Sequence, residues 1–308
     1  MTIDTIKMRR LSESLAEGEV KGRSLWADAR KRFMRNKAAV AGVVMLIFVT
    51  AYAFLGDYVA AYTYDFKDFA IMGHAAETGA PSWSNGHYFG VDNDGRDMFA
   101  VTAQGTRISL MVGIVGTVIA VIVGTIYGAV SGYAGGRTDG IMMRIVDILL
   151  SIPFMFVIIL LLVMFGRSMA MLFAGIGLLS WLNMARIVRG QTLSLKNKEY
   201  IEAARATGVP AWKIILRHVV PNLLGIVAVY ATLLIPDMIL TESFISFLGL
   251  GVQAPMTSLG ALISDGAKTM QYGTIWALLV PLFFFVVTMF AFYFIGDGLR
   301  DALDPKDR

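Results

Sequence analysis

Six stretches of about 20 residues contain no charged side chain, and they constrain this chain more than any other feature of its sequence. A helix needs roughly 20 mostly apolar residues to cross a bilayer, where its backbone groups bond within the helix itself. The composition agrees, because 56% of the 308 residues are hydrophobic and only 16% are charged. The sequence therefore predicts an all-α, polytopic membrane protein with about six transmembrane helices. The predicted spans are residues 38–55, 108–130, 148–165 with a kink at Pro153, 168–185, 219–236 and 272–295.

The lysines and arginines predict how these helices are oriented. When the segments between the spans are assigned alternately to two sides, 22 of the 27 basic residues fall on the side of the amino terminus. Cytoplasmic loops of membrane proteins carry such an excess. We therefore expect both termini to lie in the cytoplasm, which requires an even number of spans and agrees with six. The same distribution explains the net charge of +4 without a nucleic-acid partner.

Several classes of function lack the residues that they need. The chain has no cysteine, which excludes disulfides and thiolate metal sites, and its three histidines are scattered. It contains no glycine-rich loop of the kind that cradles the phosphates of ATP. It also offers no set of nucleophile, base and orienting group. We expect no enzyme activity, metal site or cofactor in this chain, so uphill transport would draw its energy from another subunit.

Ionisable residues are absent from the middles of the predicted spans. A charge there costs on the order of 3 kcal/mol and usually marks an ion or substrate path. Three acidic residues lie near span ends, with Asp147 at the inner end of the third helix and Asp237 and Glu242 at the outer end of the fifth. For Asp237 and Glu242 we expect solvation at the interface, with a substrate or gating role as the alternative. The pattern disfavours a carrier coupled to protons or sodium.

Glycines recur at every fourth position along the second predicted helix and its exit. Small side chains at this spacing line one face of a helix and let a second helix approach closely. We interpret the stripe as a helix-packing face. Its members are Gly124, Gly128, Gly132 and Gly136.

The predicted cytoplasmic loop, residues 186–218, contains two short helical segments. The first, residues 198–207, is stopped by Gly208, and the second starts at Pro210 and runs to Arg217. Within the first segment, small side chains would let the helix sit deep in a groove on a partner, while a glutamate and an arginine offer charges that set its register. A solvated amphipathic connector is the alternative interpretation.

The same loop contains the pattern Glu202-Ala203-Ala204, then Gly208, then Pro221. This pattern resembles the EAA signature of the membrane permeases of binding-protein-dependent ABC importers. Further segments resemble the dipeptide and oligopeptide branch of that family, so that the likeness covers nearly the whole chain. These segments are residues 87–97, 105–110, 242–251 and 296–305.

The resemblance implies a type I ABC importer permease fold and an ATP-driven import of oligopeptides through the bacterial plasma membrane, which is the inner membrane where a cell has two. The same branch also carries dipeptides, nickel chelates and other small solutes, which remain the alternative. The implied partners are a second related permease, two cytosolic ATPases that bind ATP and Mg, and an extracytoplasmic peptide-binding protein. The implied ATPase-coupling helix contains Glu202, Ala203, Ala204, Arg205 and Gly208.

The resemblance also suggests how the chain is divided. A cytoplasmic segment (1–37) would precede a first helix and outer loop (38–99), a core permease domain (100–300) that includes the loop 186–218, and a cytoplasmic tail (301–308).

The outer segment from residue 237 to residue 265 alternates apolar residues with glycines and a proline. Backbone of this kind at membrane depth must be covered by protein or water. We interpret the segment as a partly re-entrant outer gate or part of the substrate path, with a plain loop as the alternative. The residues that we assign to it are Asp237, Glu242, Phe244, Phe247, Gly249 and Gly251.

Overall fold

The computed structural model describes residues 25–303, and the regular secondary structure of this range is helical. Most of the predicted segment 1–37 and tail 301–308 therefore lie outside the described residues. The helices are α2 (Leu25–Arg35), α3 (Lys37–Val59), α4 (Ala75–Thr78), α5 (Met98–Ala134), α6 (Gly136–Ser151), α7 (Phe154–Phe165), α8 (Met169–Leu195), α9 (Glu199–Ala206), α10 (Ala211–Ile214), α11 (Val220–Phe247), α12 (Leu259–Thr269) and α13 (Trp276–Leu303).

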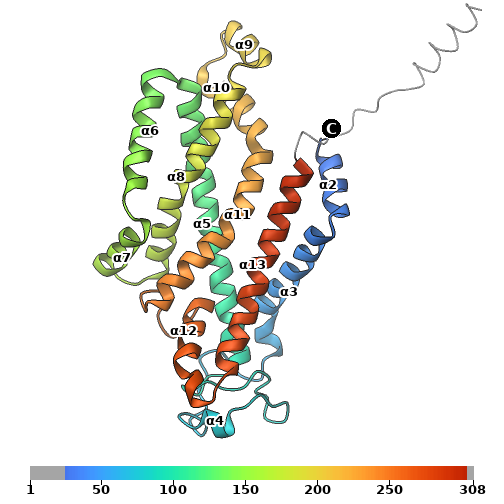
Figure 1. Ribbon diagram of the computed structural model, residues 1–308, viewed down its shortest axis with the longest axis vertical. Coiled ribbons are helices and arrows are strands. Elements are labelled where there is room, and N and C mark those ends of the chain that lie inside the picture. The colour runs from blue at the N-terminus through green and yellow to red at the C-terminus, as the bar shows by residue number, and fades with distance from the viewer. Residues whose placement is uncertain (1–24, 304–308) are drawn as a thin grey trace, which may run out of the picture.

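Long helices run side by side along the molecule (Figure 1). Within the described residues, five helices are long and apolar enough to span a membrane, and the bent pair α6–α7 makes up to six. Helices α2 and α9 and the last turn of α13 lie at one end, which we call the inner end because the basic residues predict it to be cytoplasmic. Helices α4 and α12 lie at the opposite, outer end. The prediction of about six transmembrane helices is confirmed.

The third crossing differs from the predicted span 148–165. Its chain breaks at Pro153, where α6 and α7 meet at an angle of 76° rather than a gentle kink. Proline disfavours the helical conformation of the residue before it. Ile152 accordingly has extended dihedral angles, with φ −82° and ψ 129°. The descending helix is therefore α6, which begins at Gly136, twelve residues before the predicted start.

A search for uncharged runs missed α6 because this helix carries charges that are paired with α8. The guanidinium of Arg189 donates two hydrogen bonds to the carboxylate of Asp139. Arg186 forms an ion pair with Asp147 through one hydrogen bond. Pairing lowers the cost of placing charge in a membrane protein, and here it also joins two neighbouring helices.

The fifth crossing is longer than the predicted span 219–236. One apolar helix extends over 37 residues, from Ala211 to Phe247, and Pro236 lies inside it without ending it. A membrane helix tolerates such a proline because neighbouring helices and side chains bond to the backbone groups that it frees. The segment that starts after Pro210 is therefore not a separate short helix, because it continues through a π-helical turn, Ile215–Val219, into α11.

The glycine stripe packs α5 against α8, as predicted, for three of its four members. A Cβ atom at Gly124 would lie 2.6 Å from the Cβ of Met184, and one at Gly132 would lie 2.8 Å from the Cβ of Thr192. At Gly128 a Cβ would overlap the backbone of Ala185. The fourth member, Gly136, starts α6 instead and has no neighbour within 4 Å of its Cβ position.

We expect Gly128→Ala to lower the stability of the protein by about 1–3 kcal/mol, because the added methyl group would push two backbones apart. Gly190→Ala on α8 is the matched control, since a Cβ there meets open space and alanine favours a helix by about 1 kcal/mol. The apparent melting temperature in detergent measures both effects. Equal melting temperatures for the two variants would contradict this account of the stripe.

Candidate coupling helix and outer gate

Helix α9 projects from the inner end of the molecule (Figure 1) and is held there by one buried side chain. Ile201 is fully buried and packs in an apolar cluster with residues of α5, α8, α10 and α11. Glu202, Ala203, Arg205 and Gly208 are exposed. The structure therefore places four of the five predicted coupling residues on a surface that a partner can reach, whereas Ala204 is half-buried against the same apolar cluster as Ile201.

Gly208 ends α9 with a backbone conformation that other residues rarely adopt. Its φ is +78°. The next N–H, of Val209, donates to the carbonyl of Ala204 at 3.1 Å, and the N–H of Gly208 donates to that of Arg205 at 3.0 Å. These two bonds form a Schellman motif, which favours glycine at this position. Pro210 then occupies the N-cap position of α10, so only four residues, 207–210, separate α9 from the 37-residue helix.

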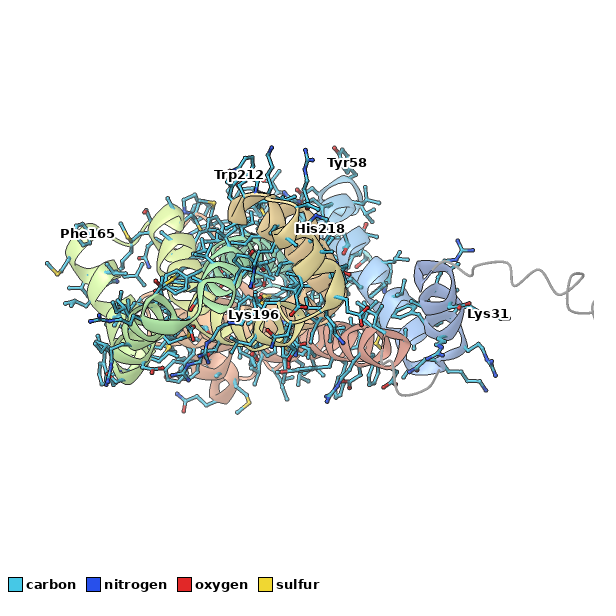
Figure 2. The ribbon with its side chains drawn as sticks, turned by 90° about the horizontal axis from the view of Figure 1, so that it is seen from above. Lys31, Tyr58, Phe165, Lys196, Trp212 and His218 are labelled. Carbon is cyan, nitrogen blue, oxygen red and sulfur yellow. The ribbon has the colours of Figure 1, made fainter. Side chains whose placement is uncertain are left out.

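Aromatic and basic side chains surround α9. The guanidinium of Arg205 lies 5.5 Å from the ring centroid of Tyr133, at the inner end of α5. The ammonium group of Lys196 donates to the carbonyl of Gly132 at 3.1 Å. Figure 2 looks onto this tip and shows Lys196 and Trp212 at its surface. Trp212 is 60% exposed, and a large apolar side chain outside the hydrocarbon region is a feature of interaction sites.

Glu242, at the outer end of the fifth crossing, is fully buried, so the expected solvation at the interface is wrong for this residue. Its carboxylate accepts hydrogen bonds from serines of α5 and α11. Asp237 is exposed, as are Phe244 and Phe247. Among the assigned gate residues of α11, Glu242 therefore faces the interior, whereas Asp237, Phe244 and Phe247 lie on the surface of this chain.

The assigned glycines shape the segment that follows α11. Gly249 has φ +76° and ends α11 with the same pair of bonds that Gly208 makes at the end of α9. Gly251 packs so tightly on Ser246 that a Cβ atom would overlap the serine hydroxyl. The predicted segment 237–265 thus contains the end of α11, a loop, and the start of α12, which packs back against α5, α11 and α13.

The outer loop before α5 contains polar groups whose role sequence reasoning missed. Asp97 caps α5 by accepting from the N–H of Ala100 at 2.9 Å, and the ring of the buried His87 lies 2.9 Å from its other oxygen. Burial raises the pKa of Asp97, and the hydrogen bond from His87 opposes that rise. The indole of Trp276 donates to the carbonyl of Val91 and so attaches the loop to α13. A pattern of Asp followed by a helix was the available signal for the cap.

Within residues 25–303, no three acidic or histidine side chains are arranged to hold a metal ion.

Comparisons with known proteins match both halves of the chain. Residues 116–308 match the family described as "Binding-protein-dependent transport system inner membrane component". Residues 24–76 match the "N-terminal TM domain of oligopeptide transport permease C".

Curated relatives align over nearly the whole length. The "Oligopeptide transport system permease protein OppC" of Escherichia coli K12 is 56% identical over 301 residues, which cover 98% of this chain and 97% of the relative. The protein of the same name from Haemophilus influenzae is 53% identical and covers 98% and 95%. The "Dipeptide transport system permease protein DppC" of Bacillus subtilis is 43% identical and covers 91% and 86%.

The family match covers more than half of the chain, and these relatives exceed 40% identity over more than nine-tenths of it. The chain therefore belongs to the family of binding-protein-dependent transport system inner membrane components, in the branch of oligopeptide transport permease C.

Proposed function

We propose that this chain is the inner-membrane permease subunit of an ATP-driven oligopeptide importer, and that α9 is the element that couples it to ATP hydrolysis. The observation that carries the proposal is the exposed helix α9, which four residues join to a 37-residue membrane helix. The similarity to two oligopeptide permeases at 53% and 56% identity supports the choice of substrate. A permease for dipeptides, nickel chelates or other small solutes is the alternative, and the dipeptide relative at 43% identity keeps it open.

The partners follow from the same proposal. A second, related permease completes the translocation path, two cytosolic ATPases bind ATP and Mg, and an extracytoplasmic binding protein delivers the peptide. The apolar surfaces of the membrane helices meet lipid or the second permease. Residues 38–99 are an extension specific to this branch, residues 100–300 are the core permease domain, and residues 186–218 are its coupling loop.

The coupling helix transmits motion because it is stiff and contacts the ATPase on one side and the membrane helices on the other. Glu202, Ala203 and Arg205 face the ATPase, while Ile201 and the half-buried Ala204 hold α9 to the apolar cluster at the inner end. Closure of the ATPase pair then moves α9 and the helix beyond Pro210 as one body, which is the kind of rigid-body motion that drives many transport cycles.

The outer gate in this proposal is the segment 237–265. The exposed rings of Phe244 and Phe247 face the path or the partner permease, and the loop that contains Gly249 and Gly251 lies where the binding protein docks. A passive channel or membrane scaffold would need neither a docking helix nor nucleotide.

Gentle affinity purification of this chain from its native membranes, followed by mass spectrometry, tests the assembly. We expect a second permease and two ATPases with phosphate-binding loops to be retained. A control ABC importer that stays intact under the same conditions shows that the method is adequate. Recovery of this chain alone would favour a self-sufficient carrier or channel.

We expect Glu202→Lys and Gly208→Val to uncouple ATP hydrolysis from uptake while leaving membrane insertion intact. The first reverses a charge on the docking surface, and the second forces a β-branched residue into φ +78°. Peptide uptake per ATP hydrolysed in proteoliposomes should fall roughly tenfold, because ATP hydrolysis then proceeds without moving α9 productively. Gly140→Val, at an exposed glycine of α6 with open space around it, is the control for Gly208→Val. Uptake at the wild-type level in both test variants would refute the assignment of α9.

Single cysteines along the gate should lose reactivity when the binding protein docks. The chain has no cysteine of its own, so Leu248→Cys and Met256→Cys each introduce one thiol at an exposed site. We expect a membrane-impermeant maleimide to label both variants in the assembled transporter, and the peptide-loaded binding protein to slow that labelling. An unrelated periplasmic protein at the same concentration is the control. Labelling that does not change would count against the gate.

A further inference from the structure

The buried carboxylate of Glu242 lies at the point where three helices meet. Serines from all three surround it: Ser109 from α5, Ser243 and Ser246 from α11, and Ser258 at the amino-terminal cap of α12. Within residues 25–303, Glu242 forms no ion pair. Burial of a carboxyl group in a membrane protein without a cationic partner is costly and calls for a specific role.

One chain of hydrogen bonds leads from α12 to the carboxylate through α5. The N–H of Leu259, the first residue of α12, donates to Ser109 Oγ at 3.1 Å. The hydroxyl of Ser109 in turn donates to Glu242 Oε2 at 3.3 Å. A serine hydroxyl can accept one hydrogen bond while it donates its single proton to another group. Ser109 therefore links the N–H of Leu259 to the carboxylate of Glu242.

A second chain leads to the other oxygen through α11. The N–H of Ala261 donates to Ser258 Oγ at 3.2 Å, and Ser258 donates to Ser246 Oγ at 3.2 Å. Ser246 then donates to Glu242 Oε1 at 2.5 Å. Both chains therefore start at N–H groups in the first turn of α12 and end on the two oxygens of one carboxylate.

In the direction assigned to these bonds, both chains end on a group that accepts at each of its two oxygens. A carboxylate accepts at both oxygens, whereas an amide or a protonated carboxyl group accepts at one and donates at the other. The first turn of a helix carries the partial positive charge of its macrodipole, which favours an anion there. The serine hydroxyls connect the positively polarised first turn of α12 to the carboxylate of Glu242.

Two glycines allow the gate segment to approach this polar cluster. A Cβ atom at Gly251 would overlap the hydroxyl of Ser246, and one at Gly260 would overlap the backbone of Ser243. The loop after α11 and the first turn of α12 thus pack directly on the serine face of α11.

We propose that Glu242 is a positioning residue that latches the outer gate, because its carboxylate receives the amino-terminal N–H groups of α12 through Ser109, Ser246 and Ser258. The latch fixes residues 248–261 to α5 and α11 in the conformation described here. The inference rests on the proposed function only in naming residues 248–261 a gate. The hydrogen bonds that attach these residues to α5 and α11 lie within this chain.

Hydrogen exchange in the assembled transporter, reconstituted in nanodiscs, tests the latch directly. In Glu242→Gln we expect either the amide of Leu259 or that of Ala261 to exchange roughly tenfold faster, because the chain that meets the glutamine NH2 group now ends on a donor instead of an acceptor. Thr241→Val is the matched control, since that hydroxyl donates only to the Asp237 carbonyl of its own helix. Exchange in Glu242→Gln that equals the control would overturn the proposal.

The order of two substitutions separates a role as acceptor from a role in packing. Glu242→Asp keeps two accepting oxygens but is shorter, whereas Glu242→Gln keeps the shape but only one accepting oxygen. We expect the aspartate variant to protect the two amides better than the glutamine variant. The reverse order would show that Glu242 only fills space.

Should neither variant fold, Ser109→Ala cuts the first chain alone. We expect faster exchange at the amide of Leu259, with exchange at Ala261 unchanged. Equal exchange at both positions would refute the relay.

Peptide uptake in the same nanodisc variants, transferred to proteoliposomes, distinguishes the latch from the proposed function. Faster exchange with impaired uptake supports both. Faster exchange with wild-type uptake supports the latch and removes the gate role from residues 248–261. Unchanged exchange refutes the latch, whatever the uptake.

Discussion

The contact between α5 and α8 supports the rest of this molecule. Gly124, Gly128 and Gly132 bring the two backbones together over most of their inner halves. Without hydrophobic driving force between helices in lipid, such close contact is a main source of association. Both candidate sites depend on it, because α5 presents Tyr133 to α9 at its inner end and Ser109 to the polar cluster at its outer end.

The crossings of the fold could be predicted from the sequence wherever lipid or apolar neighbours surround a helix. The rule of uncharged runs placed α3, α8 and α13 to within a few residues at their outer ends. It misplaced α6, because the two aspartates of that helix are paired with Arg186 and Arg189, which lie 39 and 50 positions later in the chain. It also ended the fifth crossing at Pro236, because the next residue, Asp237, is charged, although α11 continues to Phe247.

The two candidate sites differ in how far local sequence determines them. Helix α9 is bounded by Gly208 and Pro210, whose backbone preferences act on their own, so its position could be predicted from residue types alone. Glu242 depends on Ser109, which lies 133 positions earlier in the chain, and on a cap at Ser258. A glutamate near a span end is usually solvated, and only the fold brings the serines that make burial possible.

The single helix from Ala211 to Phe247 has a geometric consequence for alternating access. Its 37 residues form a rod roughly 55 Å long, at about 1.5 Å per residue. A rod that tilts about a point along its length, such as its contact with α5 near Ile235 and Ile239, moves its two ends in opposite directions. When the cytoplasmic end of this helix moves in one direction, the end near Phe247 therefore moves in the opposite direction. One rigid element of this kind can open a path on one side while it narrows the path on the other, with no signal passed through flexible parts.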